Sequence, residues 1–245
     1  MALASALHKI KVADHVLTAY AINVAGNILA NMIDTEIKQM KRVLVIKAHP
    51  FDATRSRSVH ILDVFMEAYR VANPEDQIQT LDLFAPEFPA LDGAMITAWG
   101  QVAAGTAFTD LPEATQRALG QFDNALAQFK AADKIVIANP MWNLSIPAQL
   151  KSWVDAITVV QETFRYTATG HVALVPGKKV VHIQAAGGRY DGKDDGTQYV
   201  YDAMTYLGVD EVTKIAVEGM DHFPDQAQEI VTAAEEQAKK VAAKF

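Results

Sequence analysis

Cysteine is absent from the 245 residues of this sequence. Its absence excludes disulfide bonds, cysteine-ligated iron–sulfur clusters and thiol nucleophiles. Any redox chemistry of the protein must therefore come from a bound cofactor. Because a chain without disulfides suits a reducing compartment, we expect a cytoplasmic protein.

Clusters of basic residues and the common nucleotide fingerprints are also missing. The formal net charge is -7, and no run of lysine and arginine occurs that would displace counterions from nucleic acid. Neither G-x-G-x-x-G nor G-x-x-x-x-G-K-[ST] is present. We therefore expect no nucleic-acid partner and no dinucleotide-type phosphate loop.

Charged residues are lacking over Val16–Ile33, a stretch of 18 residues. That length is sufficient for a transmembrane helix or a signal peptide. However, Asn23, Asn27 and Asn31 recur every four residues and would line one face of a helix. For residues 1–40 we expect an amphipathic N-terminal helical extension of unknown role and no membrane span. Membrane association, targeting and a misplaced translation start are the alternatives.

Hydrophobic periodicity becomes regular from residue 42 onward. Short apolar runs predict strands, and apolar residues at helical spacing predict helices. The predicted strands are 42–47, 77–83, 134–138, 178–184 and 212–217, and the predicted helices are 58–71, 112–132, 147–160, 197–207 and 227–243. Residues 84–111 contain proline or glycine at five positions, so we expect an irregular segment there.

The alternation of strands and helices predicts right-handed crossovers and a parallel sheet. Over residues 41–245 we expect an α/β fold, a flavodoxin-like doubly wound sheet of five strands in the order 2-1-3-4-5. Such sheets bind ligands at the carboxyl ends of strands 1, 3 and 4. The loops after those three strands are therefore the candidate site.

The loop after the first strand has the composition of a phosphate site. Thr54, Ser56 and Ser58 supply hydroxyl donors beside the main-chain N–H groups of a helix start. Arg55 and Arg57 add positive charge, which the helix dipole reinforces. Ordinary capping of the helix by serine is the alternative.

His49 and the other two loops complete the candidate site. His49 lies in the loop just after the first strand, so we expect it beside the ligand; a purely structural histidine is the alternative. Pro140 stiffens the loop after strand 3, where Trp142 would pack against a planar ring or, alternatively, anchor a turn. Gly187 and Gly188 permit close backbone approach after strand 4, although a tight surface turn is the alternative. Together the three loops favour a mononucleotide with a planar ring, such as a flavin.

Five short motifs give the sequence a resemblance to a known family. They are Pro140-Met-Trp-Asn143, Gln149-Leu-Lys151, Thr163-Phe-Arg-Tyr-Thr167, Gly177-Lys-Lys179 and Gly187-Gly188. Their content and order resemble the FMN-dependent NADH azoreductases, also called FMN-dependent NADH:quinone oxidoreductases, over residues 42–245.

This resemblance implies a homodimer with FMN bound where two subunits meet. The cofactor-binding positions it implies are His49, Ser56, Arg57, Ser58, Met141, Trp142, Asn143, Leu144, Ala185, Ala186, Gly187 and Gly188. On the substrate side it implies Tyr166 and Tyr190. It implies no catalytic side chain and no metal ligand, because FMN carries the chemistry.

The sequence departs from the family at four places within these positions. His49 stands where the family has a serine, and Trp142 replaces a tyrosine. Ala185 and Ala186 replace a Ser-Arg pair, which removes two polar contacts, and Tyr190 replaces a histidine. We expect these changes to alter the preference for the electron acceptor.

The activity that the resemblance implies is hydride transfer from NADH or NADPH through FMN to a quinone or azo compound. No separate nicotinamide fingerprint appears, so we expect donor and acceptor to use one site in turn, a ping-pong mechanism. The alternatives are a flavodoxin-type carrier of single electrons and a flavin-binding protein without turnover. Residues 161–178, which resemble a substrate-side flap, favour the enzyme.

Overall fold

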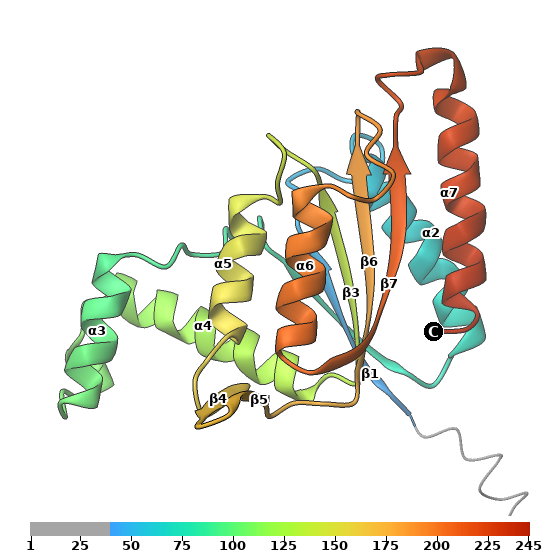
Figure 1. The fold of residues 1–245 in the computed structure, drawn as a ribbon. Coiled ribbons are helices and arrows are strands. Elements are labelled where there is room, and N and C mark those ends of the chain that lie inside the picture. Colours follow the sequence, from blue (N-terminus) through green and yellow to red (C-terminus); the bar gives the residue numbers. More distant parts are fainter. Residues whose placement is uncertain (1–39) are drawn as a thin grey trace, which may run out of the picture. The chain divides into compact units, whose positions relative to one another are not determined.

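The computed structural model describes residues 40–245 and contains a five-stranded parallel sheet (Figure 1). Its strands are β1 (Arg42–Lys47), β2 (Gln77–Asp82), β3 (Lys134–Pro140), β6 (Lys178–Ala186) and β7 (Val209–Glu218), in the order β2-β1-β3-β6-β7. The predicted flavodoxin-like α/β fold is confirmed. The N-terminal helical extension predicted for residues 1–40 lies outside the described residues, except for Met40.

A hairpin changes the numbering of the strand order from the predicted 2-1-3-4-5 to 2-1-3-6-7. Its strands, β4 (Phe164–Thr167) and β5 (Gly170–Ala173), are antiparallel and lie between the third and fourth sheet strands along the chain. The hairpin could not be predicted from hydrophobic periodicity because its strands are four residues long and mostly exposed, so that no apolar run marks them.

Helices cover both faces of the sheet (Figure 1). One face is covered by α2 (Arg57–Ala72) and α7 (Ala227–Ala242), and the other by α4 (Glu113–Ala131), α5 (Ala148–Ile157) and α6 (Asp195–Tyr206). Alternate side chains of β1 enter the two cores: Val43 and Val45 pack with α2 and α7, whereas Leu44 and Ile46 face the other layer. Burial on both faces explains why the strands read as continuous apolar runs.

Residues 84–111 are not irregular throughout, so that prediction is wrong. They contain α3 (Gly93–Ala103) and a short 3-10 helix, η1 (Phe108–Asp110); a second one, η2 (Pro224–Gln226), precedes α7. Asp92 caps α3 by accepting a hydrogen bond from the Met95 N–H at 2.9 Å. Gly93 begins the helix and Gly100 lies inside it, where glycine costs about 1 kcal/mol without preventing the helix, whereas Gly105, with a φ of 99°, follows its end.

The remaining predicted elements are confirmed to within a few residues at their ends. The differences that matter most are in β3 and β6, which extend past their predicted ends to Pro140 and Ala186. Pro140 pairs with Ala185, so the two strands enter the candidate site side by side.

Residues 40–245 contain no helix long and apolar enough to cross a membrane. The cytoplasmic location expected from the missing cysteine stays a prediction.

Candidate functional site

A hollow of about 250 Å³ opens at the carboxyl ends of β1, β3 and β6, where doubly wound sheets bind ligands. Its lining residues are His49, Arg55, Ser56, Arg57, Ser58, Pro140, Met141, Trp142, Ala185, Ala186, Gly187, Met220 and Asp221. The structure thus gathers most of the predicted cofactor residues in one place. Three predicted residues, Asn143, Leu144 and Gly188, adjoin them in the chain without lining the hollow.

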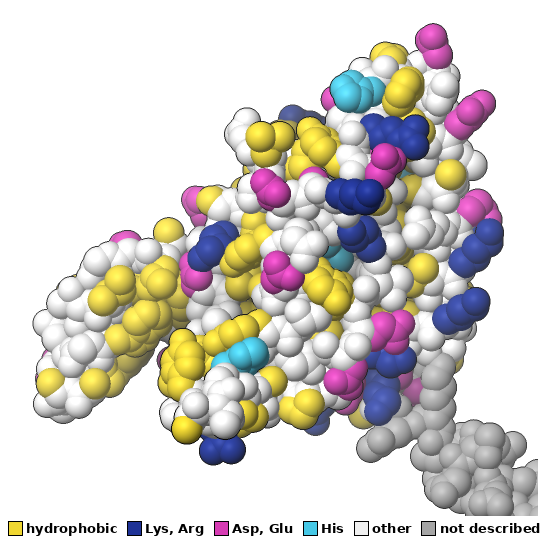
Figure 2. Space-filling model, in the orientation of Figure 1, with side chains coloured by type: hydrophobic (Ala, Val, Ile, Leu, Met, Phe, Trp, Pro, Cys, Tyr) yellow, Lys and Arg dark blue, Asp and Glu magenta, His cyan; other side chains and the backbone are white. Residues whose placement is uncertain are grey.

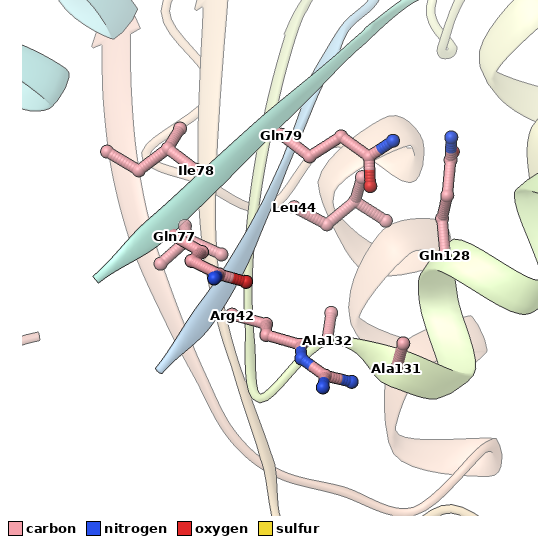
Figure 3. Close-up of a pocket in the computed structure, with 9 residues that line it drawn as sticks. Arg42, Leu44, Gln77, Ile78, Gln79, Gln128, Ala131 and Ala132 are labelled. Carbon is pink, nitrogen blue, oxygen red and sulfur yellow. The ribbon is translucent and has the colours of Figure 1, made fainter. Parts of the chain in front are cut away.

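A second hollow, of about 400 Å³, lies at the other end of the sheet (Figure 3). Arg42 and Gln77 at the starts of β1 and β2 line it, together with Gln128 near the end of α4. Because it lies at the amino ends of the strands, it is not where this class of sheet binds a cofactor.

The amino terminus of α2 forms one wall of the first hollow. Ser56 caps the helix: its Oγ accepts a hydrogen bond from the Val59 N–H at 3.3 Å and lies 3.2 Å from Ser58 Oγ. Both serines are buried. The capping alternative is therefore correct for Ser56, while Ser58 lines the hollow and the first turn of α2 offers N–H groups of the kind that bind anions.

Two exposed arginines give this wall its positive charge. Arg57 is the first residue of α2, and the Arg55 guanidinium lies 3.4 Å from the centroid of the Phe51 ring. Thr54 does not line the hollow, because its hydroxyl and N–H both donate to Asp52 Oδ1, at 2.6 and 3.0 Å. These bonds, and then the charge of Arg55, lower the pKa of Asp52. Thr54 thus shapes the loop instead of supplying a ligand contact.

His49 is buried between the aromatic side chains of Phe51 and Trp142, of which Trp142 lines the hollow. Its ring centroid lies 5.5 Å from that of Phe51 and 5.5 Å from that of Trp142. Its Nδ1 accepts a hydrogen bond from the Phe51 N–H at 3.1 Å, which places the proton of the neutral ring on Nε2. Burial, and then the charge of Lys47, lower the pKa of His49. At neutral pH His49 is therefore an uncharged N–H donor.

The loop after β3 is a tight turn. The Trp142 N–H donates to the Ser145 carbonyl at 2.9 Å, and the Ser145 N–H donates to the Trp142 carbonyl at 3.1 Å. Asn143 and Leu144 occupy the tip with φ of 49° and 71°, the pattern of a type I′ turn. Trp142 is 40% exposed and faces the hollow, whereas Asn143 and Leu144 project from the surface.

The loop after β6 approaches a residue that the sequence analysis did not identify. A Cβ added to Gly187 would lie 1.9 Å from Asp221 Oδ2 and 2.7 Å from its carboxyl carbon, so a larger residue fits here only if the Asp221 side chain moves. The Asp221 N–H also donates to the Gly187 carbonyl at 2.9 Å. Asp221 and Met220 follow β7, a strand whose loop the sequence analysis did not include in the site.

The two predicted substrate-side tyrosines lie apart from each other. Tyr190 follows the glycine loop, with its ring 2.8 Å from a Cβ built on Gly188. Tyr166 lies on the β4–β5 hairpin, where His171 stacks on Tyr206, the last residue of α6, with centroids 4.0 Å apart. The hairpin is thus at the amino ends of the sheet strands, opposite the hollow (Figure 1). Within one chain the structure does not bring Tyr166 to the site.

Beneath the hollow, β3 and β6 carry buried polar side chains that the sequence analysis missed. Asn139 and His182 are 0% and 1% exposed, and His182 Nε2 lies 2.7 Å from Asn139 Oδ1. Gln184 is likewise buried and accepts a hydrogen bond from Asn139 Nδ2 at 3.1 Å. Polar residues inside apolar runs, just before the ligand-binding loops, were the signal that would have identified them.

His182 should make the folding stability depend on pH. Burial lowers its pKa from 6.5 to about 4, and the attraction of Asp194 opposes this only in part. As the pH falls below 6.5 the unfolded chain takes up the proton first, so stability decreases between pH 6.5 and 4. At pH 5 the expected loss from this group is about 2 kcal/mol. Urea unfolding at neutral pH and at pH 5 should show this loss in the wild type and not in His182→Phe; equal pH dependence would contradict the assignment.

The arrangement of the hollow fits a phosphorylated planar ligand. A cationic helix start offers hydroxyl and N–H donors, His49 and Trp142 offer flat aromatic surface, and Gly187 lines the hollow without a side chain. No three histidine, aspartate or glutamate side chains in the described part of the chain gather as a metal site would require.

Comparison with known proteins agrees with this geometry. A family model described as flavodoxin-like fold matches residues 41–242. An FMN-dependent NADH:quinone oxidoreductase of Streptococcus suis is 40% identical over 195 residues, which cover 80% of this chain and 95% of that protein. An azoreductase structure from Bacillus anthracis has a TM-score of 0.76 at 36% identity, covering 84% of this chain and 100% of that one. A B. anthracis FMN-dependent NADH-azoreductase solved with FMN has a TM-score of 0.73 at 29% identity, with coverage of 83% and 100%.

The fold, the position of the hollow and the matched family model define a flavodoxin-like protein. Within that class, the chain belongs to the family of FMN-dependent NADH:quinone oxidoreductases and azoreductases, and it is therefore an oxidoreductase. The resemblance drawn from its motifs is confirmed.

Proposed function

We propose that this protein is an FMN-dependent oxidoreductase that uses NADH or NADPH to reduce quinones or azo compounds by a ping-pong mechanism. When bound, FMN would supply the two-electron hydride chemistry. The observation that carries the proposal is the convergence of the Ser56–Ser58 helix start, Trp142 and the Gly187 backbone on one hollow. The reactions named for its relatives support the same assignment.

The residues of the hollow have separable roles in this proposal. Ser58, Arg57 and the first turn of α2 would hold the FMN phosphate, because they combine donors with positive charge. Trp142 and the neutral ring of His49 would border the flavin and exclude water from it. The backbone at Gly187 would place N–H donors against the ring, where they stabilise negative charge.

We further propose a homodimer in which each hairpin borders the hollow of the other copy. Tyr166 is 69% exposed and lies at the opposite end of the sheet from the hollow of its own chain. Figure 2 shows apolar side chains gathered over α3 and the hairpin. The exposed apolar residues of these two elements include Ile96, Trp99 and Val172. Apolar surface of this kind marks a protein contact.

Tyr166→Ala should weaken binding of the electron acceptor and leave FMN bound. The loss of one aromatic contact predicts a rise of about three- to tenfold in the KM for benzoquinone. Light scattering should give twice the chain mass of 26.7 kDa. The matched control is Tyr201→Ala, because Tyr201 is also exposed but lies on α6. A monomer, or equal effects of the two substitutions, would contradict the proposed dimer.

Initial-rate kinetics test the proposed reaction sequence. With NADH varied at several fixed benzoquinone concentrations, double-reciprocal plots should be parallel, because the donor leaves the shared site before the acceptor enters it. Intersecting lines would require both substrates to be bound together and would contradict the ping-pong scheme.

A further inference from the structure

Five buried polar side chains on β3, on β6 and at the start of α6 form one hydrogen-bonded relay beneath the hollow. They are His182, Asn139, Gln184, Asp194 and Thr197, and none is more than 5% exposed. Asn139 Nδ2 donates to Gln184 Oε1 at 3.1 Å. Gln184 Nε2 in turn donates to Asp194 Oδ1 at 2.8 Å and to Thr197 Oγ1 at 3.0 Å. The relay therefore ends on a carboxylate, which also caps α6.

The direction of each bond in the relay is fixed. An ionised Asp194 can only accept, so Gln184 must turn its NH₂ group toward it and its carbonyl oxygen toward Asn139. Asn139 Nδ2 also donates to the Pro140 carbonyl at 2.9 Å, which directs its Oδ1 to His182 Nε2. No amide can flip without leaving a buried polar atom unpaired. The relay is thus a rigid support with one possible arrangement.

The turn after β3, which the relay supports, contains strained backbone. Asn143 and Leu144 both have φ in the left-handed region, which leucine rarely adopts. Strained residues of this kind persist only where their surroundings hold them, and they occur most often at functional sites. The turn therefore depends on whatever fixes its base.

Two hydrogen bonds fix that base, at the peptide between Pro140 and Met141. The Met141 N–H donates to the Ala185 carbonyl at 2.7 Å, and the Pro140 carbonyl accepts from Asn139. We propose that Asn139 and Gln184 are positioning residues of the FMN site, which hold residues 140–144 in the shape that borders the flavin without contacting it. This inference rests on the proposed function, and it adds two residues that lie outside the lining of the hollow.

Two substitutions of graded severity test the proposal. Gln184→Met keeps the length of the side chain and removes its hydrogen bonds, whereas Thr197→Val removes a single hydroxyl. For the full chain stripped of flavin, fluorescence titration should show the Kd for FMN raised at least tenfold by Gln184→Met and by a smaller factor by Thr197→Val. The visible absorption of bound FMN should shift in both variants. If Gln184→Met does not fold, Thr197→Val alone decides the outcome.

Tyr69→Phe is the matched control. The Tyr69 hydroxyl donates to Asp76 Oδ2 at 2.5 Å and accepts from Lys134 Nζ at 2.8 Å, at the other end of β3. Its loss should lower the free energy of unfolding but leave the Kd and the flavin spectrum unchanged. The proposal is overturned if the Kd for FMN rises in proportion to the loss of unfolding free energy in all three variants, Tyr69→Phe included. It is also overturned if Gln184→Met and Thr197→Val both bind FMN like the wild type. A wild type that binds no FMN would instead overturn the proposed function.

Discussion

Gly187→Val should abolish tight FMN binding, with the Kd raised at least a hundredfold, or roughly 2.8 kcal/mol. A Cβ at this position would overlap the Asp221 carboxylate, and Asp221 itself lines the hollow. The valine side chain must displace the Asp221 carboxylate, which unlike Tyr190 belongs to a residue that lines the hollow, or shift the loop, and either change alters the surface beside residue 187 where we expect FMN. Fluorescence titration of the apoprotein with FMN measures the effect.

Gly120→Val is the control for this substitution. Gly120 lies within α4, with no atom within 4 Å of an added Cβ, so the variant should fold and bind FMN normally. Gly188→Val is a weaker test, because its Cβ meets only the ring of Tyr190, which can turn away. Unchanged flavin affinity in Gly187→Val would show that FMN does not approach this loop.

Arg57→Gln should weaken FMN binding by about 10- to 100-fold, since a charge-assisted bond to a phosphate contributes about 1.5–3 kcal/mol. The stability of the apoprotein should instead increase. A positive charge at the first residue of α2 opposes the helix dipole, so its removal should stabilise the fold by about 0.3–1 kcal/mol. Titration with FMN and urea unfolding of the apoprotein measure the two effects separately.

Riboflavin and Arg70→Gln are the controls for the phosphate assignment. Riboflavin lacks the phosphate, so its Kd should be the same in Arg57→Gln and in the wild type. Arg70 lies in the last turn of the same helix, where its charge favours the dipole, and Arg70→Gln should leave FMN binding unchanged. An equal loss of FMN and riboflavin affinity in Arg57→Gln would place the phosphate elsewhere.

The sheet and three of its ligand-binding loops could be predicted from the sequence because local patterns encode them. Strands buried on both faces, such as β1 and β3, are short apolar runs, and helices between them require a parallel sheet. That topology alone brings the segments around Ser56, Trp142 and Gly187 to one edge. The FMN-binding role of these residues stays a prediction, although the structure brings them together.

The residues that could not be predicted depend on contacts between distant segments. Asn139 and Gln184 are 45 residues apart, and only the β3–β6 register places their amides together. Asp221 enters the hollow because the chain turns back after β7, which no local pattern near Gly187 indicates. Tyr166 was expected on the substrate side, yet the hairpin places it opposite the hollow, where a second copy is needed for that role.

The most direct test of the account is the reaction of the purified full-length protein with NADH. We expect a yellow protein that contains FMN. NADH should bleach its visible absorbance in the absence of oxygen, benzoquinone should restore that absorbance, and NADH should be oxidised steadily when both are present. Gly187→Val, purified in the same way, should be colourless and inactive. A wild-type protein that takes up no FMN, or that holds FMN which NADH does not bleach, would contradict the central claim.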